Sequence, residues 1–167
     1  MKRMMKMKNK RDNIAEYILW IWQLEDYLRA FPDAATDKDS SSSDMRFLAE
    51  LSEMMHREGV TKKGHVQLAQ NAMAELEELH HRLLDEDASY RAAMIRLTPA
   101  LNIFKSKTDN PLMSDIEAGI TLLYQVMLLR LQQKEITPAT AETQTQVTQQ
   151  LQFLSKIYRS EKVSFPS

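Results

Sequence analysis

The chain has 167 residues, of which 43% are hydrophobic and 27% are charged, and its formal net charge is −1. This composition suits one folded domain with an apolar core and excludes an intrinsically disordered chain, which combines low hydrophobicity with high net charge. No cysteine is present, so disulfides, thiolate metal ligands and a cysteine nucleophile are excluded, and the composition fits a reducing, cytoplasmic compartment.

The scarcity of glycine and proline indicates the fold class. Three glycines and five prolines provide few of the tight turns that a multi-stranded sheet needs, and the sequence contains no Gly-rich phosphate-binding loop. Every strongly periodic segment follows the helical repeat. We therefore expect an all-α fold: a single-domain bundle of about five or six helices at 13–160, with a basic tail at 1–12 and a C-terminal tail at 161–167.

The N-terminal tail is unbalanced in charge, because Met1 to Arg11 contains six Lys or Arg residues and no acidic residue. Such a tail can attract the phosphates of nucleic acid or anionic lipid, but it can equally be a solvated extension or a further turn of the first helix. It contains no aromatic residue for base stacking. A secretory signal is disfavoured, because the apolar segment that follows contains Glu16 and runs into Glu25.

The first predicted helix begins after Asn13, whose side chain can cap the backbone, with Glu16 three residues further on. Apolar residues then recur at steps of three and four, which places them on one face. Trp20 and Trp22 widen this apolar arc, so the helix should have neighbours on more than one side. Pro32 is expected to end it.

Two further helices are expected after an exposed, serine-rich loop at 33–43. The second helix covers 44–58 and ends at Gly59, which favours the left-handed conformation of a helix C-terminus. The third helix covers 64–86 and directs His80 inward together with its apolar residues.

Three helices complete the predicted bundle. The fourth covers 89–107 and contains Pro99, which should kink or break it near 96–98. The fifth, at 114–134, begins with Ser114 as its cap and is expected to be the central helix. Its apolar core of 16 residues is shorter than the roughly 20 of a membrane span and includes charged residues, so no transmembrane segment is expected. The last helix runs from Thr137 to about residue 160.

Glu77 and His80 are the candidate metal ligands. A Glu-x-x-His pair places a carboxylate and an imidazole on one side of a helix, as in di-iron and di-manganese bundles, but such centres use two pairs and this sequence supplies only one such helix. The structural alternative is that His80 lies at an apolar interface and bonds one neighbour through a ring nitrogen. His56 and His65 flank the 59–64 turn, and two histidines alone do not define a zinc site.

A second polar cluster lies on the first helix, where Glu25 and Arg29 are four residues apart in the favourable order. Trp22 and Asp26 lie close to them on the helical wheel. The structural interpretation is an ion pair at the edge of the core, with Arg29 lying on Trp22. The functional interpretation is a polar pocket for a ligand.

The apolar arcs of the first and fifth helices also predict self-association. The candidate contact residues are Trp20, Trp22, Tyr27 and Phe31, because large aromatic side chains in a partly exposed patch favour interfaces over open solvent. We expect a homodimer. The alternative is a monomer, in which the fourth helix and the 32–43 loop cover these side chains.

Three segments carry a resemblance to a known family: NIAEYILWIWQLEDYLRA at 13–30, HREGVTKKGHVQLAQNAMAELEELHHRLL at 56–84 and SDIEAGITLLYQVMLLRLQQKEITPAT at 114–140. They resemble a bacterial family of small helical proteins known only as a domain of unknown function. The resemblance covers most of 13–160 and leaves out the basic start. It implies a bacterial, cytoplasmic, all-helical protein without an assigned activity, and it transfers no functional residues.

The functional hypotheses follow from these observations. No motif specifies a reaction, and we expect no cofactor. The leading hypothesis is a noncatalytic helical interaction module. The alternatives are a metal-dependent helical-bundle enzyme that uses Glu77 and His80, and a binder of nucleic acid or anionic surfaces through the basic tail. Metal analysis separates the first two hypotheses, and salt-dependent binding to polyanions isolates the third.

Overall fold

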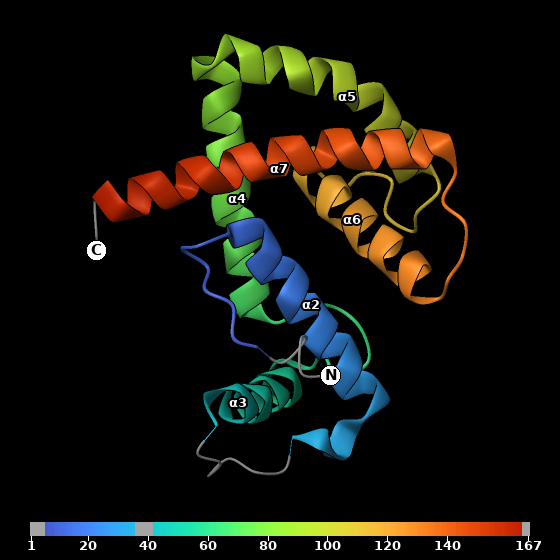
Figure 1. The fold of residues 1–167 in the computed structure, drawn as a ribbon. Coiled ribbons are helices and arrows are strands. Elements are labelled where there is room, and N and C mark those ends of the chain that lie inside the picture. Colours follow the sequence, from blue (N-terminus) through green and yellow to red (C-terminus); the bar gives the residue numbers. More distant parts are fainter. Residues whose placement is uncertain (1–5, 36–41, 165–167) are drawn as a thin grey trace. The chain divides into compact units, whose positions relative to one another are not determined.

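The computed structural model describes residues 6–35 and 42–164 (Figure 1). Within these residues the chain forms six α-helices and one short 3-10 helix, and no strand. The all-α prediction is therefore confirmed. The helices are α2 (Ile14–Ala30), η1 (Pro32–Ala34), α3 (Ser43–Glu58), α4 (Gln67–Glu86), α5 (Ala88–Ser106), α6 (Asp115–Leu131) and α7 (Pro138–Ser164).

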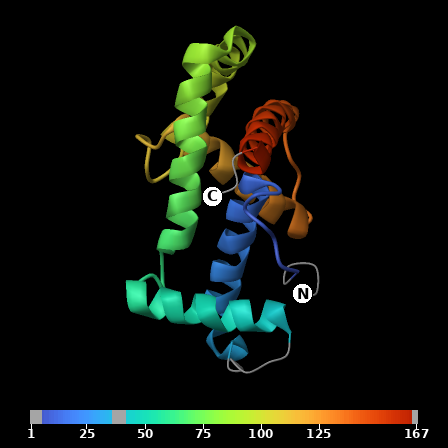
Figure 2. The same cartoon turned by 90° about the vertical axis from the view of Figure 1, so that its left-hand side faces the viewer.

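The chain divides into two compact units, Met1–Ala74 and Glu75–Ser167, and each is described by itself. In the first unit, Asn13 Oδ1 accepts the Glu16 N–H at 3.1 Å, as predicted, and α2 ends one residue before Phe31. Gly59 ends α3 in the left-handed conformation, with φ 72°. α3 packs on α2 and crosses it at a steep angle (Figure 2).

α2 is buried over most of its circumference, which agrees with its wide apolar arc. Its sequence lacks the single stripe of an ordinary surface helix, because apolar residues occupy adjacent as well as three- and four-spaced positions. Burial of its large side chains supplies much of the apolar core of this unit. The buried residues of α2 are Ile14, Ala15, Tyr17, Ile18, Trp20, Ile21, Trp22, Leu24, Glu25 and Leu28.

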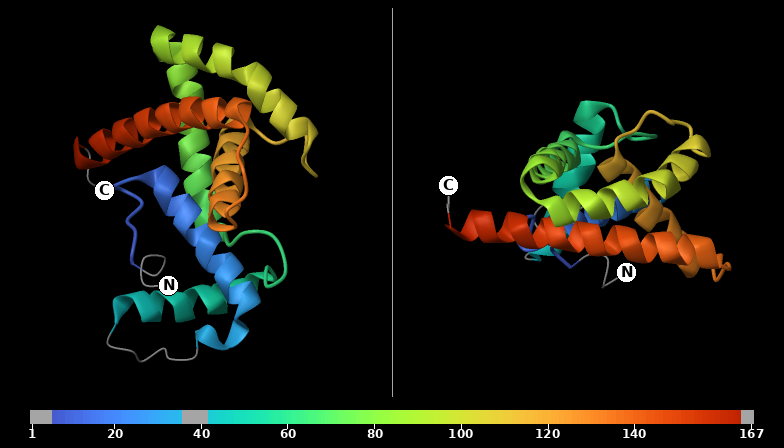
Figure 3. Two further views of the ribbon diagram at one scale, coloured as in Figure 1. Left: turned by 45° about the vertical axis from the view of Figure 1, so that its right-hand side comes forward. Right: turned by 90° about the horizontal axis from the view of Figure 1, so that it is seen from above.

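In the second unit, α5, α6 and α7 pack on one another. α5 and α7 run in roughly opposite directions, and α6 crosses them (Figure 3). Ser114 Oγ caps α6 by accepting the Glu117 N–H at 3.1 Å, and Thr137 caps α7 by accepting the Thr140 N–H at 3.2 Å. The buried apolar residues of α5, α6 and α7 are Tyr90, Met94, Leu97, Leu101, Ile116, Ala118, Ile120, Leu122, Val126, Val147, Leu151, Leu154 and Tyr158.

Gly119 permits a close approach between α6 and α7. A Cβ atom at this position would lie 3.2 Å from Cγ1 of Val147, which is tighter than ordinary van der Waals contact. A side chain on Gly119 would therefore force Val147 to move. Glycine weakens a helix interior, and here the close packing of the two helices accounts for its presence.

Several helix ends differ from the prediction. α4 begins at Gln67 rather than at 64, because Gly64 has φ 90° and cannot belong to a right-handed helix. α6 ends at Leu131 rather than at 134, because Gln133 adopts a φ of 57°. α7 continues to Ser164, which extends the last helix beyond residue 160.

Pro99 bends α5 without breaking it. Of the predicted kink or break, the break is absent, because the helix is continuous from Ala88 to Ser106, and Figure 3 shows the helix bending along its course. Proline removes one backbone donor and crowds the preceding turn, which accounts for a bend. No helix among the described residues is long and apolar enough to cross a membrane.

Candidate functional site

Among the described residues of the first unit, the most deeply buried carboxylate is that of Glu25, on α2. Its side chain is fully buried and accepts two hydrogen bonds. Nδ1 of His65 lies 2.7 Å from Oε1, and the backbone N–H of Val66 donates to Oε2 at 2.7 Å. A buried carboxylate is tolerated only where such partners replace water.

His65 is held from two sides. Its ring stacks on Trp22, with centroids 4.3 Å apart and an interplanar angle of 10°, while Nδ1 faces Glu25. The His65 side chain remains 37% exposed. An Nδ1–H that donates to the carboxylate fixes the neutral ring in the tautomer whose Nε2 is an acceptor. The arrangement therefore orients one imidazole rigidly at the surface of the unit.

Arg29 clamps the loop that carries His65. Its Nη2 donates to the carbonyl oxygens of Val60 and Gly64, at 2.9 and 2.5 Å, and its Nη1 donates to Asp26 at 3.0 Å. The expected pair between Glu25 and Arg29 is thus replaced by one with Asp26, because His65 and Val66 occupy the Glu25 carboxylate. The expected stacking partner of Trp22 is likewise His65 rather than Arg29.

We call this set of residues the Glu25 cluster. Its members are Trp22, Glu25, Asp26 and Arg29 of α2, with Val60, Gly64, His65 and Val66 of the loop between α3 and α4. The residue spacing along the first helix predicted all its α2 members. It missed His65, because a helical wheel shows neighbours along one helix and not across the fold. A hollow of about 70 Å³ adjoins Arg29 and is lined in part by Ser52 and His56.

The aromatic residues expected at an interface differ in exposure. Trp20 and Trp22 are 3% and 6% exposed, whereas Phe31 is 58% exposed. Tyr27 is half-buried and packs on Phe31, with ring centroids 5.1 Å apart. Of these four side chains, Phe31 is the one that offers a large exposed surface.

Glu77 and His80, the candidate metal ligands, bind different partners in the second unit. Glu77 Oε1 accepts a hydrogen bond from the Ser114 hydroxyl, which also caps α6. His80 is 5% exposed, and its Nδ1 lies 2.6 Å from the hydroxyl of Tyr90. Across residues 6–35 and 42–164, no three or more His, Asp or Glu side chains gather in a way that could hold a metal ion.

The His80–Tyr90 pair is held in its uncharged form. Burial, and next the charge of His81, lower the pKa of His80 to about 4. Burial, and next the charge of Asp115, raise the pKa of Tyr90 above its ordinary value. Both shifts favour a neutral hydrogen bond inside an apolar core.

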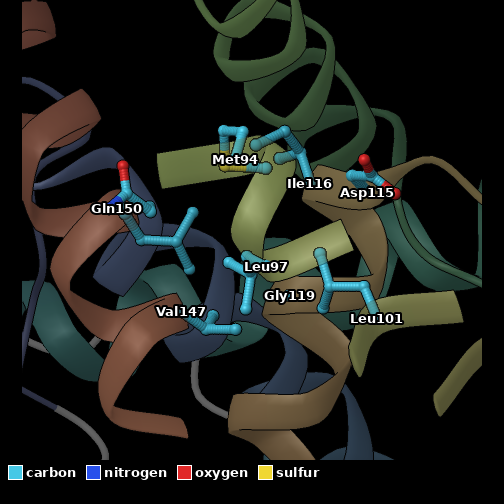
Figure 4. Close-up of a pocket in the computed structure, with 9 residues that line it drawn as sticks. Met94, Leu97, Leu101, Asp115, Ile116, Gly119, Val147 and Gln150 are labelled. Atoms are coloured by element: carbon cyan, nitrogen blue, oxygen red, sulfur yellow. The ribbon is translucent and has the colours of Figure 1, made fainter. Parts of the chain in front are cut away.

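A small cavity lies between α5, α6 and α7 (Figure 4). Its volume of about 10 Å³ is close to the minimum for one water molecule. Its walls are mostly apolar, with Leu97, Leu101 and Val147 around it. This cavity is a packing defect of the core beside Gly119 and is too small for an organic ligand.

The outer face of α5 is apolar and exposed. We define it as Ala88, Ala92, Ile95, Pro99 and Ile103, which follow one another at steps of four, three, four and four residues and are all exposed. Ile95 is 65% and Ile103 is 60% exposed. The opposite side of the same helix packs in the core, so α5 is apolar on two sides.

Residues 6–35 and 42–164 form helices and no strand, so the protein is of the all-α class. The chain belongs to the family described as Domain of unknown function (DUF4924), whose model matches residues 4–164. This confirms the resemblance to a family of unknown function, and it shows that the match includes most of the basic tail, which the resemblance had left out. A comparison with curated proteins gave no match, and a comparison with solved structures gave none either.

Proposed function

We propose that this protein is a noncatalytic helical interaction module that self-associates through the outer face of α5. The supporting observation is the exposure of Ile95 and Ile103 on one side of a helix whose other side is already packed. A surface helix of a monomer ordinarily presents polar residues on its outer side. A continuous exposed apolar strip is typical of a contact surface.

The dimensions and charges of this face suit a helical partner. From Ala88 to Ile103 it spans about 22 Å of helix, at about 1.5 Å per residue. None of its five residues is charged, so a second copy can lie against it without direct charge repulsion. Phe31, which is also largely exposed, is a secondary candidate contact from the sequence-predicted set.

The test is the solution mass of three proteins by light scattering on a size-exclusion column across micromolar concentrations. The natural chain should show a mass above 19.4 kDa that rises with concentration. Ile95→Glu should shift it to the monomer. Leu112→Glu is the matched control, because Leu112 is 93% exposed in the loop before α6 and lies off the outer face of α5.

A natural chain that stays at monomer mass at every concentration would contradict self-association. Equal effects of the Ile95 and Leu112 substitutions would contradict the choice of α5. Circular dichroism of both variants checks that each remains helical.

We also propose that the protein resides in the bacterial cytoplasm. The support for this proposal is the absence of cysteine from the printed sequence, which fits a reducing compartment, and the bacterial family that the three segments resemble. Fractionation of cells that produce the tagged chain tests this location. Recovery in a periplasmic or secreted fraction would contradict it.

A further inference from the structure

A large hollow of the first unit lies where the basic tail meets the aromatic side chains of α2 and α3. Its volume is about 400 Å³, within the range of small-molecule sites. The tail itself has no aromatic residue for base stacking, but the fold brings aromatic residues of α2 and α3 to the tail. The lining residues are Met7, Lys8, Asn9, Lys10, Tyr17, Trp20 and Phe47.

A hydrogen bond to a side chain of α3 ties the tail in this position, and local bonds shape the turn before α2. The N–H of Met7 donates to Oδ1 of Asp44 on α3 at 3.0 Å. At the other end, Asn9 accepts the Asp12 N–H at its carbonyl and the Arg11 N–H at its side chain, at 3.1 and 2.8 Å. The segment before α2 therefore starts beside α3 and runs alongside α2 to the first residue of that helix (Figures 1 and 2).

The wall opposite the tail is aromatic. The Trp20 and Phe47 rings stack with centroids 4.8 Å apart and an angle of 19°, and Tyr17 lies 5.9 Å from Trp20. Trp20 is 3% and Tyr17 is 9% exposed, whereas Phe47 is half-buried, so Phe47 is the ring of this wall that offers most surface to the hollow. Stacking on Trp20 fixes the orientation of the Phe47 ring, which suits its exposed part to contact a flat ligand.

We infer that this hollow binds a small anionic ligand with a flat aromatic body, of the mononucleotide class. Lys8 and Lys10, which line the hollow, supply positive charge for a phosphate, and the exposed part of Phe47 supplies a surface for the ring. A volume of about 400 Å³ accommodates one such molecule rather than a length of strand. This site goes beyond the proposed self-association, because it lies in the other unit and does not involve α5.

Calorimetric titration of the full chain with three probes tests the inference. The probes are adenosine 5′-monophosphate, adenosine and inorganic phosphate. The monophosphate should bind, and adenosine and phosphate should each bind about tenfold or more weakly, because each lacks one half of the recognised chemistry.

Two pairs of substitutions locate the site. Lys8→Ala with Lys10→Ala should weaken binding of the monophosphate about tenfold. Lys62→Ala with Lys63→Ala is the matched control, because it removes the same charge from an exposed loop of the same unit and should leave the affinity within about twofold. Phe47→Leu should weaken binding of the monophosphate and leave any binding of inorganic phosphate unchanged.

Three results would overturn the inference. The first is no binding of the monophosphate at millimolar concentration. The second is equal affinity for the monophosphate and adenosine, which would remove the role of the lysines. The third is an equal loss in the two lysine pairs, which would indicate only general attraction between charges. None of these results bears on the solution mass, so they are distinct from a failure of self-association.

Discussion

The carboxylate of Glu25 holds the ring of His65, which lies 40 residues further along the chain, with 2.7 Å between Oε1 and Nδ1. The same carboxylate accepts the Val66 N–H, so one buried side chain of α2 fixes two consecutive residues of the loop. The Glu25 side chain of α2 therefore anchors the loop that leads into α4.

Glu25→Ala should lower the free energy of unfolding by about 3 kcal/mol, because it removes two hydrogen bonds and leaves the buried N–H of Val66 without a partner. Glu25→Gln should cost less, since it keeps an acceptor of the same shape. Urea unfolding measures both. Glu50→Ala, an exposed residue of α3, is the control and should change little. An alanine variant at position 25 as stable as the natural chain would refute the anchoring role.

Arg29→Lys should loosen the loop although it conserves the charge. Lysine cannot reproduce the fork that bonds both Val60 and Gly64, so the expected loss of stability is about 1 to 2 kcal/mol. Hydrogen exchange should become faster across 60–66. Arg57→Lys, an exposed position on α3, serves as the control. Unchanged exchange in the Arg29 variant would show that the loop does not depend on this clamp.

Helix identity and capping could be predicted from the sequence because both depend on neighbours along the chain. Asn13, Ser114 and Gly59 each adopt the predicted role. The partners of Glu25 could not be predicted in this way. They come from a loop, and only the folded chain brings His65 and Val66 to the carboxylate.

The same limit applies to the basic tail. Its charge was visible in the sequence, but the aromatic side chains of Trp20 and Phe47 reach it only through the crossing of α2 and α3. The sequence pattern also did not predict helix ends that depend on the conformation of a single residue. An example is the end of α6, which is followed by Gln133 with its positive φ.

His80 should make stability depend on pH. Its pKa is about 4 in the folded protein and about 6.5 in the unfolded chain, so between pH 6.5 and 4 the unfolded state binds more protons. The free energy of unfolding should therefore fall as the pH falls through this window, by about 3 kcal/mol at most. His80→Phe should remove this step, as measured by urea unfolding at several pH values.

The exposed neighbour His81 provides the control for this experiment. His81→Gln removes a nearby charge that lowers the pKa of His80, so the step should shrink slightly and persist. An unchanged pH dependence in His80→Phe would show that another group titrates in this window.

Protein purified without chelator should contain no stoichiometric iron, manganese or zinc. Glu77 bonds Ser114 and His80 bonds Tyr90, so the two candidate ligands serve different contacts. Elemental analysis of the purified chain decides the matter. Two metal atoms per chain would overturn the noncatalytic proposal and make Glu77 and His80 ligands.

Because Arg29 holds the loop at Val60 and Gly64, exposure to solvent does not by itself make the loop accessible to a protease. Lys62 and Lys63 are exposed, in the kind of loop that trypsin ordinarily cuts. A protease must draw several residues into an extended conformation in its own cleft, and the carbonyls of Val60 and Gly64 on either side are bonded to Arg29. We therefore expect cleavage after these lysines to require the loop to leave α2 first, and the loop to be a poor substrate although its lysines are exposed.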